Sequence, residues 1–151
     1  MTAERRDPTA LALRLLARRE YGRLELRDKL LRAGYDAGDV ALALDALVAA
    51  GYQDDARYAE MLTRTRVRQG HGPLRLRQDL QRAGVEPAAD TEIDWLVQAK
   101  AVYQKRFGDT VPADAKDYAR RVRFLAGRGF TGDIIRRVLA ATSREGDFSA
   151  D

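Results

Sequence analysis

The 151-residue sequence contains no cysteine, which excludes disulfides, thiolate metal sites and cysteine nucleophiles. A single histidine, His71, is too few for a histidine-based metal cluster or proton relay. The only serines, Ser143 and Ser149, stand near the C-terminus, and no GxxxxGK[ST] loop is present to cradle phosphate. These absences predict a binding protein that is not an enzyme and that holds no metal or other cofactor.

Long hydrophobic runs are also missing. No window approaches the roughly 20 apolar residues needed to span a bilayer, and the first 16 residues lack the pattern of a cleavable signal peptide. Since 45% of the residues are apolar and 33% are charged, the chain is expected to fold as a soluble protein. We expect it in the cytoplasm, without membrane contact.

Arginine is the most informative residue type that is present. Of 27 basic residues, 23 are arginine and four are lysine, and the net charge is +4. The planar guanidinium suits carboxylates and phosphates, which indicates an acidic partner. A high genomic GC content, which favours arginine codons, is the alternative cause.

Hydrophobic spacing and helix-terminating residues predict an all-α protein, with no credible pair of strands. Asp54 and Asp55, the one adjacent pair of carboxylates, stand where a helix should begin and are interpreted as caps, not as a catalytic pair. The expected helices span about residues 8–19, 23–33, 37–50, 55–69, 73–83, 87–107, 115–127 and 132–139.

An internal repeat organises these helices. A shift of 50 residues places YGRLELRDKLLRAG (21–34) on HGPLRLRQDLQRAG (71–84), with eight identities in 14 positions. A weaker third copy, at a shift of 109, places Phe130, Ile135, Arg136 and Leu139 on the first. The sequence therefore predicts tandem three-helix repeats in an elongated, right-handed array, which can be straight or curved. The expected boundaries are 8–51, 52–108 and 113–141, the third repeat being incomplete, followed by a disordered tail over 142–151.

Charge follows the repeat. Residues 10–35, 57–85 and 118–139 carry net charges of +4, +5 and +5, whereas residues 36–56 and 86–117 carry −5 and −3. If the repeats stack in register, this alternation forms a basic stripe that attracts nucleic acid or an acidic protein surface. A solvated surface with alternating signs is the plain alternative.

Arginines within this pattern are the candidate partner-binding residues, although each could instead cap a helix or lie along its surface. Tyr21, His71 and Phe130 share one repeat position and are expected to close the turn between two helices. The candidate arginines are Arg14, Arg18, Arg27, Arg32, Arg64, Arg68, Arg77, Arg82, Arg123 and Arg136.

Three runs carry a family resemblance. They are ALRLLARREYGRLELRDKLLRAG, GYQDDARYAEMLTRTRVRQGHGPLRLRQDL and RRVRFLAGRGFTGDIIRRVL, in this order. Together they resemble the bacterial RecX family over about residues 9–140. The most specific part is GY-x-DD-x-RYA with the GHGP turn that follows it.

The resemblance implies a small, non-catalytic regulator of the RecA recombinase. Such proteins lie in the groove of the RecA filament on single-stranded DNA and limit its growth. As a result, three activities of RecA fall: its ATPase, its strand exchange in homologous recombination and DNA repair, and its promotion of the SOS response. We expect a monomer, and single- or double-stranded DNA is a further candidate partner.

Two other classes of function compete with this reading. One is a free-standing nucleic-acid-binding protein whose units act as helix-turn-helix modules. The chain has no asparagine and its arginines are spread over all units, so a surface without base readout is favoured over a sequence-specific one. The other is a purely structural helical adaptor, which would not need a basic stripe.

Overall fold

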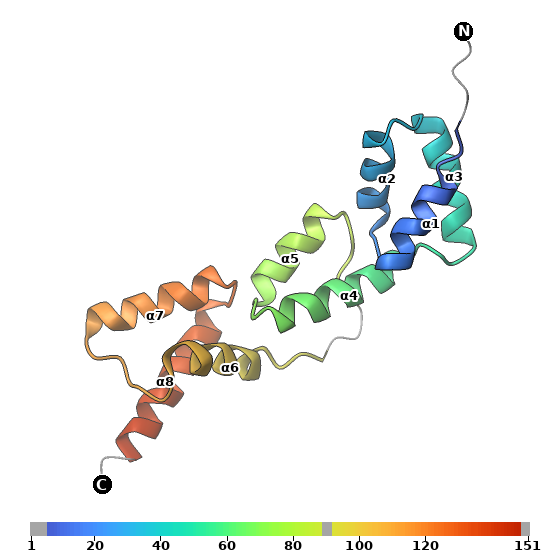
Figure 1. Cartoon of the computed structure of the whole chain (residues 1–151). Helices are drawn as coiled ribbons and strands as arrows, with labels where there is room; N and C mark the ends of the chain where they lie inside the picture. The colour runs from blue at the N-terminus through green and yellow to red at the C-terminus, as the bar shows by residue number, and fades with distance from the viewer. Residues whose placement is uncertain (1–5, 89–91, 149–151) are drawn as a thin grey trace. The chain divides into compact units, whose positions relative to one another are not determined.

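The computed structural model describes residues 6–88 and 92–148, and within these ranges the chain is all-α, without a strand, as predicted (Figure 1). The helices are α1 (Thr9–Arg18), α2 (Arg23–Arg32), α3 (Ala37–Ala49), α4 (Asp55–Arg68), α5 (Pro73–Arg82), α6 (Trp95–Phe107), α7 (Ala115–Gly127) and α8 (Gly132–Phe148).

The chain divides into two compact units. The first holds α1, α2 and α3, with α4 as far as Leu62 and α5 from Leu80 onward. The second holds α6, α7 and α8, with the remainder of α4 and α5 (Thr63–Asp79). Two helices thus contribute to both units, and each unit has a hydrophobic core of its own.

The first core lies between α1, α2 and α3, which pack against one another. Ala12 of α1, Leu26 and Leu30 of α2, and Leu44 of α3 are all buried in it. Leu26 and Leu30 are four residues apart, so both lie on the face of α2 that meets the other two helices. Burial of each such side chain contributes about 1.5–3 kcal/mol to folding.

The Asp54–Asp55 pair serves the ends of two different helices. Asp54 accepts the Ala56 amide at 2.8 Å and therefore caps α4, as predicted. Asp55 accepts the Arg23 amide at 2.8 Å, at the start of α2, and also the side-chain amide of Gln53 at 2.8 Å. These two carboxylates fix the starts of α2 and α4 relative to each other within the first unit.

The second core lies between α6, α7 and α8. Ala99 and Tyr103 of α6 are buried there with Leu125 of α7 and Ile135 of α8. The sequence placed α6 in the second repeat, but its apolar face packs on α8. Helix α8 also continues to Phe148, so residues 142–148, expected as a tail, are helical, and 149–151 lie outside the described residues.

The expected start of α6 at Pro87 is wrong. Residues 85–88 and 92–94 are not helical, and the helix begins at Trp95. Asp94 is its N-cap, since the carboxylate accepts the Val97 amide at 3.1 Å. The Asp94 carboxylate accepts a hydrogen bond from an amide of the first turn that would otherwise be unpaired. Pro87 has no side-chain acceptor and cannot cap a helix in this way.

Burial confirms most of the repeat. Leu26, Leu76 and Ile135 occupy one repeat position and all are buried. Tyr21 and Phe130, which were expected to close turns, are buried in the two cores. His71, at the same repeat position, is only partly buried. Leu74 is 48% exposed because it lies almost opposite the buried Leu76 on α5.

A direct contact between two backbones joins the start of α5 to the turn between α7 and α8. The Gly72 amide donates to the Arg128 carbonyl at 2.8 Å, and the Leu74 amide donates to the Gly129 carbonyl at 2.9 Å. Gly129 has φ +96°, and a Cβ there would lie 2.6 Å from the Arg75 Cβ. A Cβ on Gly72 would lie 2.5 Å from the Gly129 oxygen. Two glycines therefore permit an approach that no larger residue allows.

A buried arginine fastens α7 to the end of α6. Arg121 donates to the Tyr103 hydroxyl at 2.7 Å and to the Thr110 carbonyl at 2.6 Å. It also forms a salt bridge of 3.1 Å with Asp117, and its guanidinium lies 4.8 Å from the centre of the Phe107 ring. These acceptors satisfy both terminal nitrogens of the buried guanidinium, whereas its Nε has no partner among the described residues.

The charges of this network are mutually supported. Burial lowers the pKa of Arg121, but Tyr103 and Asp117 outweigh it and hold that pKa above its ordinary value. Hydrogen bonds from the Arg120 guanidinium and from the Ala113 amide lower the pKa of Asp117 to about 2. Both groups therefore stay ionised throughout the neutral range.

The glycine contact can be tested by a pair of alanine substitutions. Gly129→Ala should destabilise the protein by about 2 kcal/mol, and so lower Tm by roughly 5 °C, because the Cβ clashes and positive φ is strained. Gly127→Ala is the control, since its Cβ meets nothing within 4 Å, and it should be neutral or slightly stabilising in a helix. Equal Tm values for the two variants would contradict a close backbone contact at Gly129.

The buried arginine can be tested by comparison with its exposed neighbour. Arg121→Ala should lower the free energy of unfolding by about 3 kcal/mol, because buried acceptors lose their donor. Arg120→Ala, whose side chain is 59% exposed, should cost less than about 1 kcal/mol. Urea titration followed by the fluorescence of Trp95, which packs against the second core, measures both. If both variants lowered the free energy of unfolding by similar amounts, the stabilising role assigned to the buried Arg121 would be wrong.

Candidate partner-binding surface

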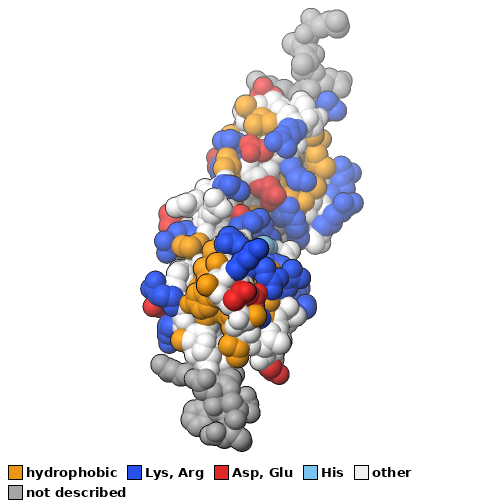
Figure 2. Space-filling view, turned by 90° about the vertical axis from the view of Figure 1, so that its left-hand side faces the viewer, with side chains coloured by type: hydrophobic (Ala, Val, Ile, Leu, Met, Phe, Trp, Pro, Cys, Tyr) orange, Lys and Arg blue, Asp and Glu red, His pale blue; other side chains and the backbone are white. Residues whose placement is uncertain are grey.

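All ten arginines proposed from the sequence are exposed. On the face drawn in Figure 2, Lys and Arg side chains recur over the surface with Asp and Glu side chains between them. Five candidates belong to the first unit and five to the second. The first five are Arg14, Arg18, Arg27, Arg32 and Arg82, and the second five are Arg64, Arg68, Arg77, Arg123 and Arg136.

The structure brings some of these arginines together along single helices. Arg14 and Arg18 lie four residues apart on α1, and so share one face of the helix. Arg64 and Arg68 have the same relation on α4. The pairs on α2 and α5 are five residues apart and do not share a face in this way.

Most of the ten have no carboxylate partner among the residues that the structure describes. Within the described part of the chain, only Arg27 and Arg136 form salt bridges, to Asp28 at 3.3 Å and to Asp133 at 4.0 Å. The other arginines with ion pairs are Arg19, Arg23, Arg57, Arg66, Arg75, Arg120 and Arg121. The ten candidates are thus available for contact, and their role in binding stays a prediction.

Two arginines outside the candidate set, Arg66 and Arg75, form ion pairs next to the turn between α4 and α5. Asp79 accepts from Arg66 at 2.7 Å and from Arg75 at 3.3 Å. Burial raises the pKa of Asp79, but these guanidiniums hold it below its usual value. Burial also lowers the pKa of His71, and Arg75, Arg128 and Arg66 lower it further, which favours the neutral imidazole.

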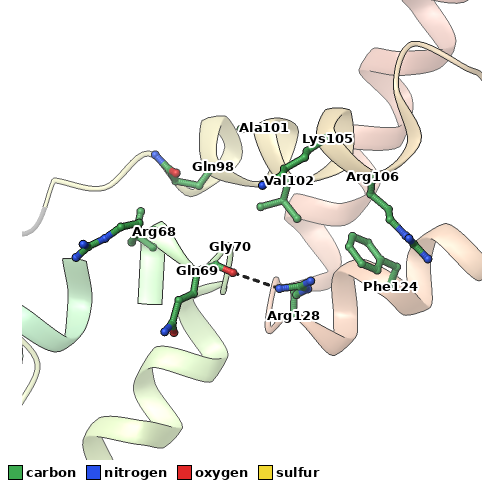
Figure 3. A pocket seen from close by; sticks show the side chains of 11 residues that line it. Arg68, Gln69, Gly70, Gln98, Ala101, Val102, Lys105, Arg106, Phe124 and Arg128 are labelled. Atoms are coloured by element: carbon green, nitrogen blue, oxygen red, sulfur yellow. Dashed lines mark hydrogen bonds between the residues drawn. The ribbon is translucent and has the colours of Figure 1, made fainter. Parts of the chain in front are cut away.

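A groove in the second unit gathers cations beside an apolar floor (Figure 3). It has a volume of about 510 Å³, and none of the eleven described residues that line it is acidic. We call it the basic groove. It is lined by Val67, Arg68, Gln69 and Gly70 from α4 and its turn, by Gln98, Ala101, Val102, Lys105 and Arg106 from α6, and by Phe124 and Arg128 from the end of α7.

Two cations of the basic groove are held in place by the protein. Arg128 donates to the Gln69 carbonyl at 3.2 Å, the bond drawn as a dashed line in Figure 3. Its guanidinium lies 5.3 Å from the centre of the Phe124 ring, and that of Arg106 lies 5.6 Å from the same ring. Phe124 also meets Phe107 edge to face at 5.4 Å. The ring therefore positions both guanidiniums through cation–π contacts.

The other two cations are less constrained. Arg68 and Lys105 are exposed, and neither has a salt-bridge partner among the described residues. Their side chains extend from α4 and α6 on different walls of the groove. They can move to meet an incoming anion, whereas Arg106 and Arg128 are already positioned.

Only Arg68 of these four cations was proposed from the sequence. Arg128 could have been found, because a shift of 109 residues places it on Arg19, which lies 3.7 Å from the centre of the Tyr21 ring. Lys105 and Arg106 have no repeated counterpart. A basic pair in the last turn of a helix is also well explained by the helix dipole, so the sequence offers no separate signal for them.

Other kinds of site find no support in the described residues. No helix in them combines the length and hydropathy required to traverse a bilayer. They also contain no group of three or more His, Cys, Asp or Glu side chains placed to hold a metal ion.

Family models match the chain in three consecutive segments. The first, second and third three-helix domains of RecX match residues 10–47, 54–89 and 92–139. The third segment contains α6, α7 and the first part of α8, and these helices share the second core. The first contains most of α1 and α3 and the whole of α2.

Similar proteins agree with the domain matches. Regulatory protein RecX of Acidithiobacillus ferrooxidans is 82% identical over all 151 residues of both chains. That of Halorhodospira halophila is 47% identical over 140 residues, which cover 89% of this chain and 87% of the relative. The crystal structure of RecX from Lactobacillus salivarius has the same fold, with a TM-score of 0.73 and 20% identity over 89% of this chain and 94% of that one. The chain with the basic groove therefore belongs to the bacterial RecX family of regulatory proteins.

Proposed function

We propose that the protein is a non-catalytic regulator that binds the RecA recombinase and its filament on single-stranded DNA. In this proposal it limits filament extension and lowers RecA's ATPase, strand-exchange and SOS-promoting activities in the cytoplasm. The observation that carries the proposal is the 82% identity over the full chain to a protein named regulatory protein RecX.

The surface supports this proposal in physical terms. Eight of the ten candidate arginines have no salt bridge within the described residues, so their charges are free to meet an acidic surface. A charged surface of this kind raises the rate of encounter with a partner of opposite charge. Helical units in tandem offer such a surface more than once, which suits a partner that is itself a repeating polymer.

The direct test is RecA's DNA-dependent ATPase. We expect the protein to inhibit it at substoichiometric concentration. Arg27→Glu with Arg77→Glu, two exposed positions related by the repeat, should raise the half-inhibiting concentration roughly tenfold, which corresponds to about 1.4 kcal/mol. Circular dichroism should show unchanged helical content.

A matched control separates position from net charge. Lys100→Glu with Lys116→Glu changes the net charge by the same amount at exposed residues of α6 and α7 outside the candidate set. This variant should inhibit nearly as well as the natural protein. No inhibition by the folded natural protein at micromolar concentration would refute the proposal, and equal loss in both variants would refute the assignment to these arginines.

Direct DNA binding is the alternative that the exposed arginines also permit. Binding to DNA without RecA should weaken steeply as salt rises, because contacts to phosphate release counterions. Tight binding to one sequence in the absence of RecA would instead favour a free-standing DNA-binding protein.

A further inference from the structure

The basic groove carries an excess of positive charge that the protein does not neutralise. Among the described residues that line it, four are cations, namely Arg68, Lys105, Arg106 and Arg128, and none is acidic. The C-terminal ends of α4, α6 and α7 also meet the groove. Each helix end contributes about half a negative charge, so the three together offset less than half of the four positive charges. The groove therefore attracts anions.

The floor of the basic groove is aliphatic where the cations leave it open. Val67, Ala101 and Val102 line it between the charged side chains. A volume of about 510 Å³ lies within the range of roughly 300–1,000 Å³ that is usual for ligand pockets. The groove thus has room for an apolar side chain of a ligand together with the anionic groups that flank it.

The aromatic ring of the groove distinguishes between two kinds of anionic ligand. Single-stranded nucleic acid binds largely by stacking its bases on open aromatic faces. Phe124 is the one aromatic residue among the described residues that line the groove, and it already lies against the guanidiniums of Arg106 and Arg128 and against Phe107. Because these contacts occupy the Phe124 ring, the groove offers a ligand mainly aliphatic side chains and cations. These groups match a peptide that combines carboxylates with aliphatic residues.

We propose that the basic groove is a docking site for a short acidic segment of a partner protein that carries an aliphatic anchor residue. The carboxylates of the segment pair with Lys105 and Arg68 and with the guanidiniums of Arg106 and Arg128. The anchor side chain packs against Val102 and its aliphatic neighbours. This inference goes beyond the proposed function, because it does not depend on which protein carries the segment.

The test uses the full chain and a fluorescein-labelled peptide that alternates Glu-Asp pairs with single leucines. Fluorescence anisotropy should show saturable binding, and the amide NMR signals of Gly70, Ala101 and Lys105 should shift. Two competitors define the chemistry: the same peptide with alanine for leucine, and an oligothymidylate of equal net charge. Both should bind roughly fivefold or more weakly at physiological salt, since neither offers an anchor for the aliphatic floor.

Charge reversals on one helix locate the site. Lys105→Glu should weaken peptide binding roughly tenfold, because it places a carboxylate beside those of the ligand. Lys100→Glu makes the same change at an exposed position of α6 outside the groove and should have little effect. Circular dichroism should show that both variants fold.

Each other outcome overturns the inference. It fails if the peptide does not bind, if its binding ignores Lys105→Glu, or if the groove signals shift only with oligothymidylate. The RecA ATPase assay keeps this result separate from the proposed function. Full inhibition without peptide binding removes the docking site alone, and peptide binding without inhibition removes the proposed function alone.

Discussion

The close backbone contact between Gly72 and Gly129 is the constraint on which the second unit depends. It holds the turn between α4 and α5 against the turn between α7 and α8. Residues 67–70 thereby form one wall of the basic groove, while α6 and the end of α7 form the remainder. A side chain at either glycine would separate the walls, so two residues without chemistry of their own determine whether the groove exists.

The arginines divide into two physical classes. Arg66, Arg75 and Arg121 are paired with Asp79 or Asp117, and they join parts of the second unit. The candidate arginines are exposed, and most lack such partners within the described residues. Composition alone suggests one uniform basic surface. In the structure, some guanidinium groups form ion pairs that hold the fold together, and the others are exposed to solvent.

The helices and the core could be predicted because hydrophobic spacing and caps act locally. Asp36 and Asp114 cap α3 and α7 at the predicted starts of these helices, and Leu26 and Leu30 are buried. The packing of α6 on α8 could not be predicted in this way, since it is decided by contacts between residues distant in sequence. The basic groove could not be predicted for the same reason. Lys105 and Arg128 line it from helices distant in sequence, and of its four cations only Arg68 was a candidate from the repeat.

Arg121 also bears on the descent of the repeats. The two repeat shifts place it on Ala12 and Leu62, which are buried and apolar. A duplicated helix that acquired a guanidinium at this point needed Tyr103 and Thr110 to receive it. Genetic exchange between α1 and α7 would place the guanidinium where Ala12 lies, without Tyr103 and Thr110 to accept its hydrogen bonds, so α7 is tied to the end of α6 in evolution as well as in structure.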